Sequence, residues 1–446
     1  MTSGPKQQSI ESADKATQGA EARARKRPTN RDKAAVWTER MLSALANGVK
    51  GGKWFSLMDK VFAPKTLAVA WAKVRDNNGV AGVDGQSIER FAVRQDVYLA
   101  ELSTGLRGST YHPQAVKRVD IPKGDGKTRP LGIPTVKDRI VQQSVRLVIE
   151  PIFEHGFAEG SYGFRPGRGC HDALRVVDGL IRQGFTYVVD ADLQAYFDAI
   201  PHDRLMQRVE EKISDGRILD LIRGWLKADI LKGTEQWTPT GGTPQGSVIS
   251  PLLANIYLDP LDKLMAASGY QMVRYADDFV ILCRTREDAD AALDEIRAWV
   301  TANGLTLHPT KTHVGDCRMP GQGFEFLGYR FEAGKRYVRK KSLTKLKDSI
   351  RDKTRRTRGV SLECIIAELN PVLRGWFGYF KQAHPVTFKD LDGFIRRRLR
   401  SVLHKQEKRS CVGFGHEDHR RWPNVFFARL GLFALHTAWT VARQSR

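Results

Sequence analysis

The pattern of apolar and polar positions differs from one part of the chain to the next. The first change, from a polar tail to helical periodicity, falls near residue 36. Residues 1–35 carry almost no large apolar side chain. This basic tail cannot bury enough surface to offset the entropy of ordering, so we expect it to be disordered. Helical patterns run from residue 36 to residue 114, with breaks at residues 77–79 and 82–85 where Asn, Asp and Gly gather. The breaks predict loops within an N-terminal extension.

Short apolar runs alternate with helical segments between residues 115 and 334. The helices include residues 138–150 and a helix after Ser250 and Pro251, where Ser can cap and Pro can occupy the first turn. Strands that neighbour one another in hairpins, with helices packed on one side, predict an α+β sheet domain. The predicted strands are residues 116–122, 128–133, 186–193, 271–275, 279–284, 324–327 and 329–332.

After residue 334 the strand patterns stop, and apolar residues recur at helical spacing. Three amphipathic helices with Arg and Lys on their outer faces predict a helical domain over residues 335–405. Residues 406–446 then form a short basic segment that could contact DNA. The positions that define the three helices are Leu343, Leu346 and Ile350, then Leu362, Ile365, Ile366 and Leu369, then Leu391, Ile395, Leu399, Val402 and Leu403.

The charge of the chain points to a polyanionic partner. The formal net charge is +22, and the residues from Lys335 onward hold 27 Lys and Arg against 9 Asp and Glu. No apolar run approaches the roughly 18 residues of a membrane span, and the N-terminus lacks a signal-peptide core. The five cysteines are far apart and include no C-x-x-C pair, so neither a disulfide framework nor a zinc site is predicted. We expect an intracellular protein without a membrane partner.

Two acidic clusters are the candidates for chemistry. In "VRYADDFVIL", Asp277 and Asp278 stand at the tip of a predicted hairpin, although Asp is also common in turns because it hydrogen-bonds its own backbone. In "YVVDADLQAYFDAI", Asp190 and Asp192 share one face where an apolar strand ends. Converging carboxylates repel one another unless hard cations such as Mg²⁺ lie between them. On a basic protein, two Mg²⁺ ions about 4 Å apart indicate phosphoryl transfer on nucleic acid.

The ordered segments around these carboxylates resemble the reverse transcriptases that group II introns encode. The resemblance begins near Asn77, covers more than two thirds of the chain and implies a right-hand polymerase with fingers, palm and a helical thumb or maturase domain. Its fingers and palm occupy residues 115–334, and the extension before them includes the start of the fingers. The segments are "KRVDIPKGDGKTRPLGIPTVKDRIVQ", "EGSYGFRPGRGCHDAL", "DADLQAYFDAI", "GGTPQGSVISPLLANIYL", "YADD", "GLTLHPTKT", "FEFLGYRF", "LNPVLRGWFGYFK" and "LDGFIRRRLRSVL".

The resemblance assigns the metal site to three carboxylates. Asp192, Asp277 and Asp278 match the catalytic residues that bind two Mg²⁺ ions, and the carbonyl of Leu193 would add a ligand. Asp190 competes with Asp192 for the first position. We favour Asp192 because the family has an aromatic residue five positions after it, and Phe197 stands there.

Five residues are predicted to contact the incoming nucleotide. The Phe197 ring would collide with a 2′-hydroxyl, which favours DNA synthesis from dNTPs over RNA synthesis. Lys123 and Arg129 flank a Gly-Asp-Gly turn and would face the triphosphate. Gln245 precedes Gly246, whose missing Cβ allows close approach of backbone and nucleotide. Lys311 matches the lysine block that is implicated in protonating the leaving group.

The helical domain is predicted to bind group II intron RNA through phosphates and 2′-hydroxyls. The resemblance further implies DNA target and primer as partners, and a bacterial, nucleoid-associated ribonucleoprotein of uncertain oligomeric state. We expect no C-terminal endonuclease, so the primer would come from elsewhere, such as a nascent strand at a replication fork. The predicted RNA contacts are Arg351, Lys353, Arg355, Arg356, Arg358, Arg396, Arg397, Arg398 and Arg400.

The sequence therefore predicts an RNA-directed DNA polymerase that also assists splicing and supports intron mobility. Two alternatives stay open at this point. One is a splicing-only RNA-binding factor that keeps the fold without synthesis. The other is a related bacterial reverse transcriptase recruited to defence or another host task, which would share the chemistry but not the RNA partner.

Overall fold

The computed structural model describes residues 36–49, 51–124, 127–409, 413 and 415–444. The predicted disordered tail, residues 1–35, lies outside them. The chain divides into two compact units, Met1–Val314 and Gly315–Arg446. The boundary lies 20 residues before the start predicted for the helical domain, so the last strands of the chain belong to the second unit.

The first unit opens with helices whose ends follow local sequence signals. Thr38, Ser87 and Thr135 each cap a helix by accepting a backbone N–H three residues later. Asn78, with φ +45°, ends one helix in the left-handed conformation, which confirms the loop predicted there. The helices are α3 (Glu39–Asn47), α4 (Met58–Val61), α5 (Pro64–Asn77), α6 (Ile88–Val93), α7 (Gln95–Arg107) and α8 (Val136–Glu154).

A four-stranded sheet with the order β2-β1-β4-β5 contains the predicted long hairpin. Strands β1 and β2 pair antiparallel with Lys117 opposite Ile133, and the register shifts between Pro122 and Gly124. Strand β4 joins β1 in parallel, and β4 and β5 were not among the predicted strands because each has only three residues. The strands are β1 (Val116–Gly124), β2 (Lys127–Ile133), β4 (Ile230–Lys232) and β5 (Glu235–Trp237).

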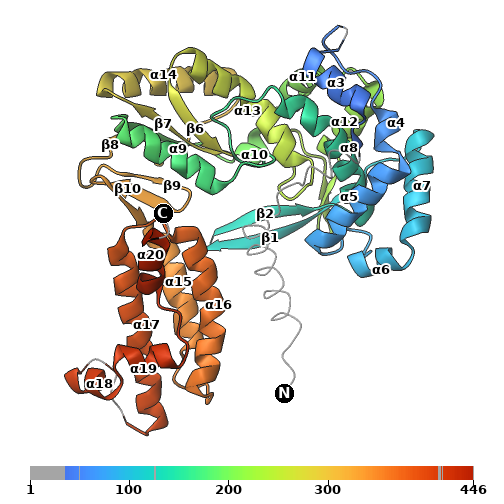
Figure 1. Ribbon diagram of the computed structural model, residues 1–446. Helices are drawn as coiled ribbons and strands as arrows, with labels where there is room; N and C mark the ends of the chain where they lie inside the picture. The colour runs from blue at the N-terminus through green and yellow to red at the C-terminus, as the bar shows by residue number, and fades with distance from the viewer. Residues whose placement is uncertain (1–35, 50, 125–126, 410–412, 414, 445–446) are drawn as a thin grey trace. The chain divides into compact units, whose positions relative to one another are not determined.

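A second four-stranded sheet has the order β6-β7-β3-β8, and helices α9, α13 and α14 pack against it (Figure 1). Strands β3, β6 and β7 lie within one residue of the predicted bounds, and β8 was not predicted. The strands are β3 (Tyr187–Asp192), β6 (Gln271–Tyr275), β7 (Asp278–Cys283) and β8 (His313–Asp316). The helices are α9 (Cys170–Arg182), α10 (Tyr196–Ala199), α11 (His202–Glu210), α12 (Gly216–Leu226), α13 (Ser250–Ala267) and α14 (Arg286–Ala302).

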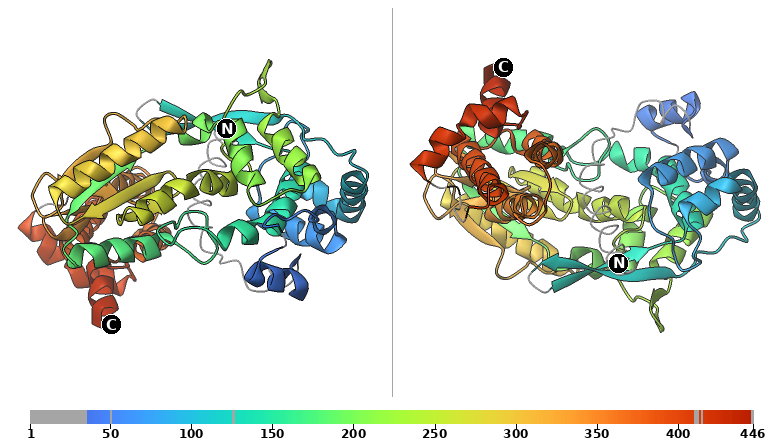
Figure 2. Two further views of the ribbon diagram at one scale, coloured as in Figure 1. Left: turned by 90° about the horizontal axis from the view of Figure 1, so that it is seen from above. Right: turned by 90° about the horizontal axis from the view of Figure 1, so that it is seen from below.

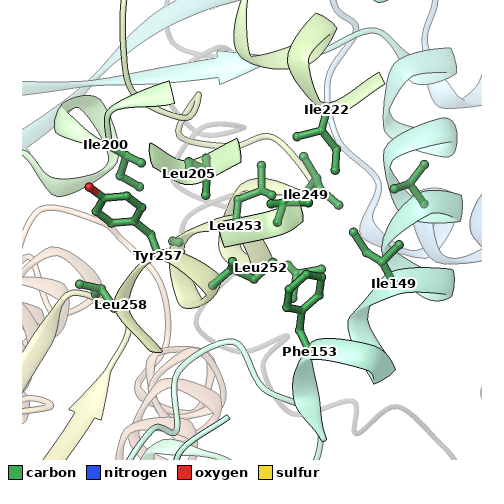
Figure 3. Packing of buried hydrophobic residues seen from close by; sticks show 14 of the residues in the cluster. Ile149, Phe153, Ile200, Leu205, Ile222, Ile249, Leu252, Leu253, Tyr257 and Leu258 are labelled. Atoms are coloured by element: carbon green, nitrogen blue, oxygen red, sulfur yellow. The ribbon is translucent and has the colours of Figure 1, made fainter. Parts of the chain in front are cut away.

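Helix α13 runs through the main hydrophobic core of the first unit. Its Leu252, Leu253 and Tyr257 are almost fully buried among side chains that include Ile149 of α8 and Ile222 of α12 (Figure 3). Most residues of α13 are buried, as expected of a helix that lies within a core. Helix α13 also packs against β6 and so supports the second sheet.

The second unit begins with a three-stranded sheet of order β11-β10-β9. The prediction that strands stop after Gly334 is wrong, because β11 follows a two-residue hairpin turn. Ala333 and Gly334 have φ values of +49° and +67°, and such a pair matches the twist of antiparallel strands. The strands are β9 (Phe324–Phe326), β10 (Tyr329–Glu332) and β11 (Lys335–Val338).

Helices make up the remainder of the second unit (Figures 1 and 2). The three predicted amphipathic helices are present as α15, α16 and α17, and Asp392 of α17 accepts the backbone N–H groups of Leu435 and His436, at 2.9 and 3.0 Å. No helix among the described residues combines the length and the apolar character needed to cross a bilayer. The helices are α15 (Lys340–Lys353), α16 (Leu362–Phe380), α17 (Pro385–Gln406), α18 (His416–Arg421), α19 (Asn424–Arg429) and α20 (Leu435–Gln444).

Candidate active site

The predicted acidic hairpin is formed by β6 and β7. Tyr275 pairs with Asp278, so Ala276 and Asp277 make the two-residue turn. Ala276 has φ +62°, a conformation that Gly usually supplies in such turns. The turn exposes part of Asp277 and of Asp278, whereas the strand residues that follow are buried. The carboxylates therefore lie at the partly exposed turn of a hairpin whose strands are mostly buried.

Strand β3 brings the first carboxylate to the same end of the sheet. It runs antiparallel to β7 with Asp192 directly opposite Asp278, while Asp190 lies opposite Val280, one step further into the sheet. Residues directly opposite each other in antiparallel strands have Cβ atoms about 4.5–5.5 Å apart. The structure thus brings Asp192, Asp277 and Asp278 together, and the register supports the choice of Asp192 over Asp190.

The lysine block approaches Asp192 through both side chain and backbone. The Lys311 ammonium donates to Oδ2 of Asp192 in a partly exposed ion pair. The backbone N–H of His308 donates to the Asp192 carbonyl at 2.7 Å, and that of Gln194 donates to the carbonyl of Thr306 at 2.8 Å. Lys311 was predicted to act on the nucleotide's leaving group, and the structure places it on Asp192, one of the three carboxylates of the predicted metal site.

The donor set suits a hard divalent cation, although the described residues contain no group of three or more His, Cys, Asp or Glu side chains already gathered at metal-binding distance. Carboxylates are the ligands that Mg²⁺ prefers. Oδ2 of Asp192 already contacts the Lys311 ammonium, so this carboxylate oxygen is accessible to a cation. Leu193 lies beside it with a buried side chain and bridges to Leu307. Its carbonyl as a fourth ligand stays a prediction.

Phe197 and Gln245 each accept a backbone hydrogen bond that ties their segments to a neighbouring one. Phe197 is half-buried in α10, and its carbonyl accepts the N–H of Thr243 at 2.6 Å. The carbonyl of Gln245 accepts the N–H of Gly132 in β2 at 2.6 Å. A Cβ on Gly246 would lie 2.5 Å from the Gly132 carbonyl oxygen. The close approach predicted at Gly246 is therefore an approach to strand β2.

Two aromatic neighbours of Phe197 shape its surroundings. Burial raises the pKa of Tyr196 well above its ordinary value, so its hydroxyl stays protonated and donates to the Ala254 carbonyl at 2.6 Å. The Phe164 ring lies 6.4 Å from the Phe197 ring, edge to face, and the residue is 42% exposed with φ +61°. Sequence reasoning missed Phe164. A positive φ at a bulky residue has no sequence signature, and such strain is concentrated at functional sites.

The predicted triphosphate contacts lie on the β1–β2 hairpin. Arg129 is exposed on β2 and pairs with Ile121 of β1. Lys123 belongs to β1, but its side chain lies outside the described part of the structure. The hairpin itself is confirmed, and the contacts with nucleotide stay predictions.

The nine predicted RNA-binding residues of the second unit have different environments. The prediction that Arg400 binds RNA is wrong. Its side chain is 1% exposed, and Nε and Nη2 donate to the Trp422 carbonyl at 3.0 and 2.9 Å. A guanidinium so buried and bonded supports the fold and is not available to RNA. Arg398 also bonds within the unit, to Thr354 at 3.0 Å. The remaining seven are exposed or half-exposed: Arg351, Lys353, Arg355, Arg356, Arg358, Arg396 and Arg397.

Two family descriptions match the chain in succession. "Reverse transcriptase (RNA-dependent DNA polymerase)" matches residues 121–331, and "Group II intron, maturase-specific domain" matches residues 343–422. Protein YkfC of Escherichia coli (strain K12) is 35% identical over 318 residues, which are 61% of this chain and 82% of YkfC. Group II intron-encoded protein LtrA of Lactococcus lactis subsp. cremoris is 37% identical over 205 residues, which are 45% of this chain and 34% of LtrA. The chain therefore spans most of YkfC and about a third of LtrA.

The fold and the site define a nucleic-acid polymerase of the reverse transcriptase class. Three Asp residues converge at one end of an antiparallel sheet, within the residues that match reverse transcriptases. A maturase-specific domain follows. The chain belongs to the group II intron reverse transcriptases with a maturase domain, which confirms the resemblance read from the sequence motifs.

Gly163 offers a test of how closely the carboxylate turn is packed. A Cβ at this position would lie 2.1 Å from the backbone nitrogen of Ala276 and 2.8 Å from the carbonyl carbon of Tyr275. The backbone of the turn would have to shift in the Gly163→Ala variant. We expect its primer-extension rate to fall by about 10²-fold, the cost that a 1 Å misplacement at a site can have.

Gly179→Ala in α9 is the matched control, because a Cβ there meets no atom within 4 Å. Primer extension on an RNA template, with thermal unfolding of each variant recorded in parallel, makes the comparison. Equal rates for the two variants would contradict the close packing of Gly163 on the turn.

Proposed function

We propose that this protein copies RNA into DNA at Asp192, Asp277 and Asp278, and that it binds the RNA of its own group II intron and assists its splicing. The observation that carries the proposal is the register of β3 and β7, which sets Asp192 opposite Asp278 beside the turn. A sheet gains nothing from two carboxylates placed directly opposite each other, since like charges at such positions are destabilising. A cation-dependent function accounts for them.

The three carboxylates, with the Leu193 carbonyl, would hold two Mg²⁺ ions that activate the attacking hydroxyl of the primer and stabilise the leaving oxygen of the nucleotide. Reverse transcriptases are generally Mg²⁺-dependent. Lys311 contacts Asp192 and reduces the negative charge at this position. The backbone bonds between residues 306–308 and β3 hold the lysine block beside the carboxylates.

The remaining residues position the nucleotide. Phe197 excludes a 2′-hydroxyl by the bulk of its ring, and the ring of Phe164 stands beside it. Gln245 is fixed by its bond to β2 and lies against the nucleotide. Arg129, together with Lys123, neutralises charge on the triphosphate. dNTPs are thus selected by the sugar and oriented by the phosphates.

The second unit supplies the contacts with intron RNA. Lys347, Arg351 and Arg397 surround the ring of Phe394, with their charged groups 5.4–5.7 Å from its centroid. Cations interleaved with an aromatic ring suit a polyanion with stacking bases. DNA target and primer are the further partners. We place the ribonucleoprotein at the bacterial nucleoid, in the cytoplasm, where that DNA is found.

Substitutions of Asp190, Asp192 and Asp277 test which carboxylates take part in DNA synthesis. Asp192→Asn and Asp277→Ala should each slow primer extension on an RNA template by about 10²-fold or more, because each removes a ligand worth several kcal/mol in the transition state. Asp190→Asn is the matched control on the same strand and should retain most of the activity.

The same variants distinguish synthesis from splicing. Asp277→Ala should still support splicing of the intron, because RNA binding resides in other residues. A wild-type protein that splices but makes no DNA would instead establish the splicing-only alternative. Loss of synthesis in Asp190→Asn with retention in Asp192→Asn would contradict the assignment of the first carboxylate.

The sugar selection by Phe197 predicts a change in substrate preference. In Phe197→Ala, the ratio of kcat/KM for a ribonucleotide to that for the matching deoxynucleotide should rise by roughly 10- to 200-fold, the range that one steric contact in a pocket supplies. Phe185→Ala, whose ring lies 4.2 Å from the Arg284 guanidinium, is the control and should leave the ratio unchanged. An unaltered ratio in Phe197→Ala would show that another group excludes the hydroxyl.

Salt titration of RNA binding tests the basic surface. Each phosphate neutralised adds about −0.7 to −0.9 to the slope of log K against log salt. Arg397→Met should reduce the magnitude of this slope by about one, whereas Arg400→Met in the same helix should leave it unchanged because Arg400 is buried. A flat dependence of wild-type affinity between about 50 and 200 mM salt would contradict a binding mode dominated by Lys and Arg.

A further inference from the structure

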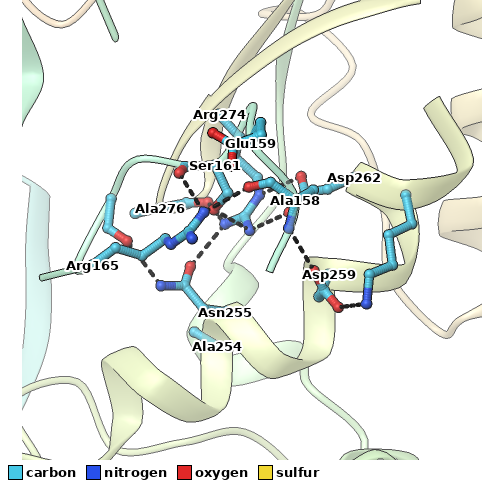
Figure 4. A network of polar contacts seen from close by, with 12 residues as sticks. Ala158, Glu159, Ser161, Arg165, Ala254, Asn255, Asp259, Asp262, Arg274 and Ala276 are labelled. Carbon is cyan, nitrogen blue, oxygen red and sulfur yellow. Dashed lines mark hydrogen bonds and ion pairs between the residues drawn. The ribbon is translucent and has the colours of Figure 1, made fainter. Parts of the chain in front are cut away.

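The carboxylate turn rests on a buried guanidinium. Arg274, the residue before Tyr275, is 1% exposed, and all three of its guanidinium nitrogens donate to acceptors inside the first unit (Figure 4). Nε and Nη2 donate to the two carboxylate oxygens of Asp262 at 2.7 and 2.5 Å. Nη1 donates to Oδ1 of Asn255 at 2.9 Å, and Nη2 donates to Oγ of Ser161 at 2.8 Å.

One contact of Arg274 reaches the turn itself. Nη1 donates to the carbonyl oxygen of Ala276 at 2.8 Å. Ala276 has φ +62°, a left-handed conformation that costs an L-residue roughly 1–2 kcal/mol. The peptide that this carbonyl belongs to leads directly into Asp277. The guanidinium therefore fixes the orientation of the peptide from which the catalytic carboxylates project.

The same network holds the segment that covers the turn. The backbone N–H of Arg274 donates to the Gly160 carbonyl, and its own carbonyl accepts from Tyr162, both at 2.8 Å. The amide nitrogen of Asn255 donates to the carbonyl of Gly163 at 2.8 Å. Gly163 is the residue whose missing Cβ lets the segment lie against Ala276. Arg274 thus holds the turn at Ala276, and Asn255 holds the segment that packs on the turn at Gly163.

Stability alone does not explain this arrangement. Asp262 comes from the core helix α13, and burial raises the pKa of its carboxyl even though the Arg274 guanidinium opposes that effect. Apolar side chains of similar volume usually serve a core as well as a buried ion pair does, so the pair is weak evidence of a stabilising role. A rigid support for the carboxylates, in which every guanidinium nitrogen of Arg274 has a hydrogen-bond acceptor, explains the network more specifically.

We propose that Arg274 is a positioning residue that presets the carboxylate turn for Mg²⁺, with Asp262, Asn255 and Ser161 as its supports. The inference rests on the proposed function, since it concerns the same site. Loosening the network should weaken metal binding by Asp277 and Asp278 before it unfolds the protein. A merely structural role would instead lower stability and leave the Mg²⁺ requirement of the folded fraction unchanged.

The test compares Arg274→Lys and Ser161→Ala with wild type in the full-length protein. Lysine keeps the charge but loses the fork that reaches Asp262 and Ala276 together. Primer extension is measured against Mg²⁺ concentration, and Mn²⁺ binding without nucleotide is measured by electron paramagnetic resonance. We expect the Mg²⁺ concentration for half-maximal rate to rise about tenfold in Arg274→Lys and about threefold in Ser161→Ala, with weaker Mn²⁺ binding in both.

Arg139→Lys is the matched control. Arg139 is a buried arginine of the same unit, and its guanidinium donates to the carbonyls of Pro134 and Val80. This variant should lose thermal stability without a change in the Mg²⁺ requirement. If Arg274→Lys does not fold, Ser161→Ala decides the question, because it removes a single hydroxyl.

The outcomes separate the two proposals. Wild type that extends no primer would refute the proposed function. Wild type that extends primers, with folded variants that share its Mg²⁺ and Mn²⁺ dependence, would overturn the positioning role of Arg274 and leave the polymerase assignment intact.

Discussion

The antiparallel pairing of β3 with β7 is the constraint on which the site depends. It sets Asp192 directly opposite Asp278, and the turn of the β6–β7 hairpin adds Asp277. Two carboxylates at opposing positions repel each other across a short distance. The sheet tolerates them because many of its other positions are apolar and buried and its supporting helix α13 lies within the core. Stability gained in the sheet and core thus offsets repulsion at one end.

Two cationic side chains act on that end in different ways. Lys311 is exposed and contacts Asp192 directly, so it can move when another cation binds. Arg274 is buried and contacts the backbone of Ala276, so it fixes the turn whatever the carboxylates bind. Three of the non-Gly residues with positive φ, namely Phe164, Ala195 and Ala276, lie in segments that adjoin the candidate site. Strain held by a bonded framework is a usual feature of preorganised sites.

The sequence motifs allowed most of the fold and the set of acidic residues to be predicted. Short apolar runs on either side of the Asp277–Asp278 pair predicted β6 and β7 closely, and the aromatic residue at position 197 favoured Asp192 over Asp190. Short strands such as β4 and β5 were missed because three residues carry too little periodicity. Strand β11 was missed because a basic stretch was assigned to the helical domain. The prediction that Arg400 binds RNA was wrong because it was inferred from a run of arginines, and such a run does not reveal which arginine faces the core.

The supporting network could not be predicted for a different reason. Ser161, Asn255, Asp262 and Arg274 lie on three separate segments, and only the tertiary fold brings them into contact. Arg274 in particular is a charged residue in strand β6, and arginine is rarely buried without partners. Its burial is possible because Asp262 and the carbonyl of Ala276 satisfy its donors. The roles of buried polar residues therefore cannot be interpreted until the tertiary structure shows their partners.

In the proposed mechanism, Asp192, Asp277 and Asp278 form one metal site. The most direct measurement is anomalous scattering from Mn²⁺ in crystals of the protein with template, primer and an incoming nucleotide. We expect Mn²⁺ peaks coordinated by oxygens of Asp192 and of the Asp277–Asp278 pair, with the Lys311 ammonium displaced from Asp192. Absence of any peak at these carboxylates in a complex that holds the nucleotide, with Lys311 still bonded to Asp192, would contradict the proposed mechanism.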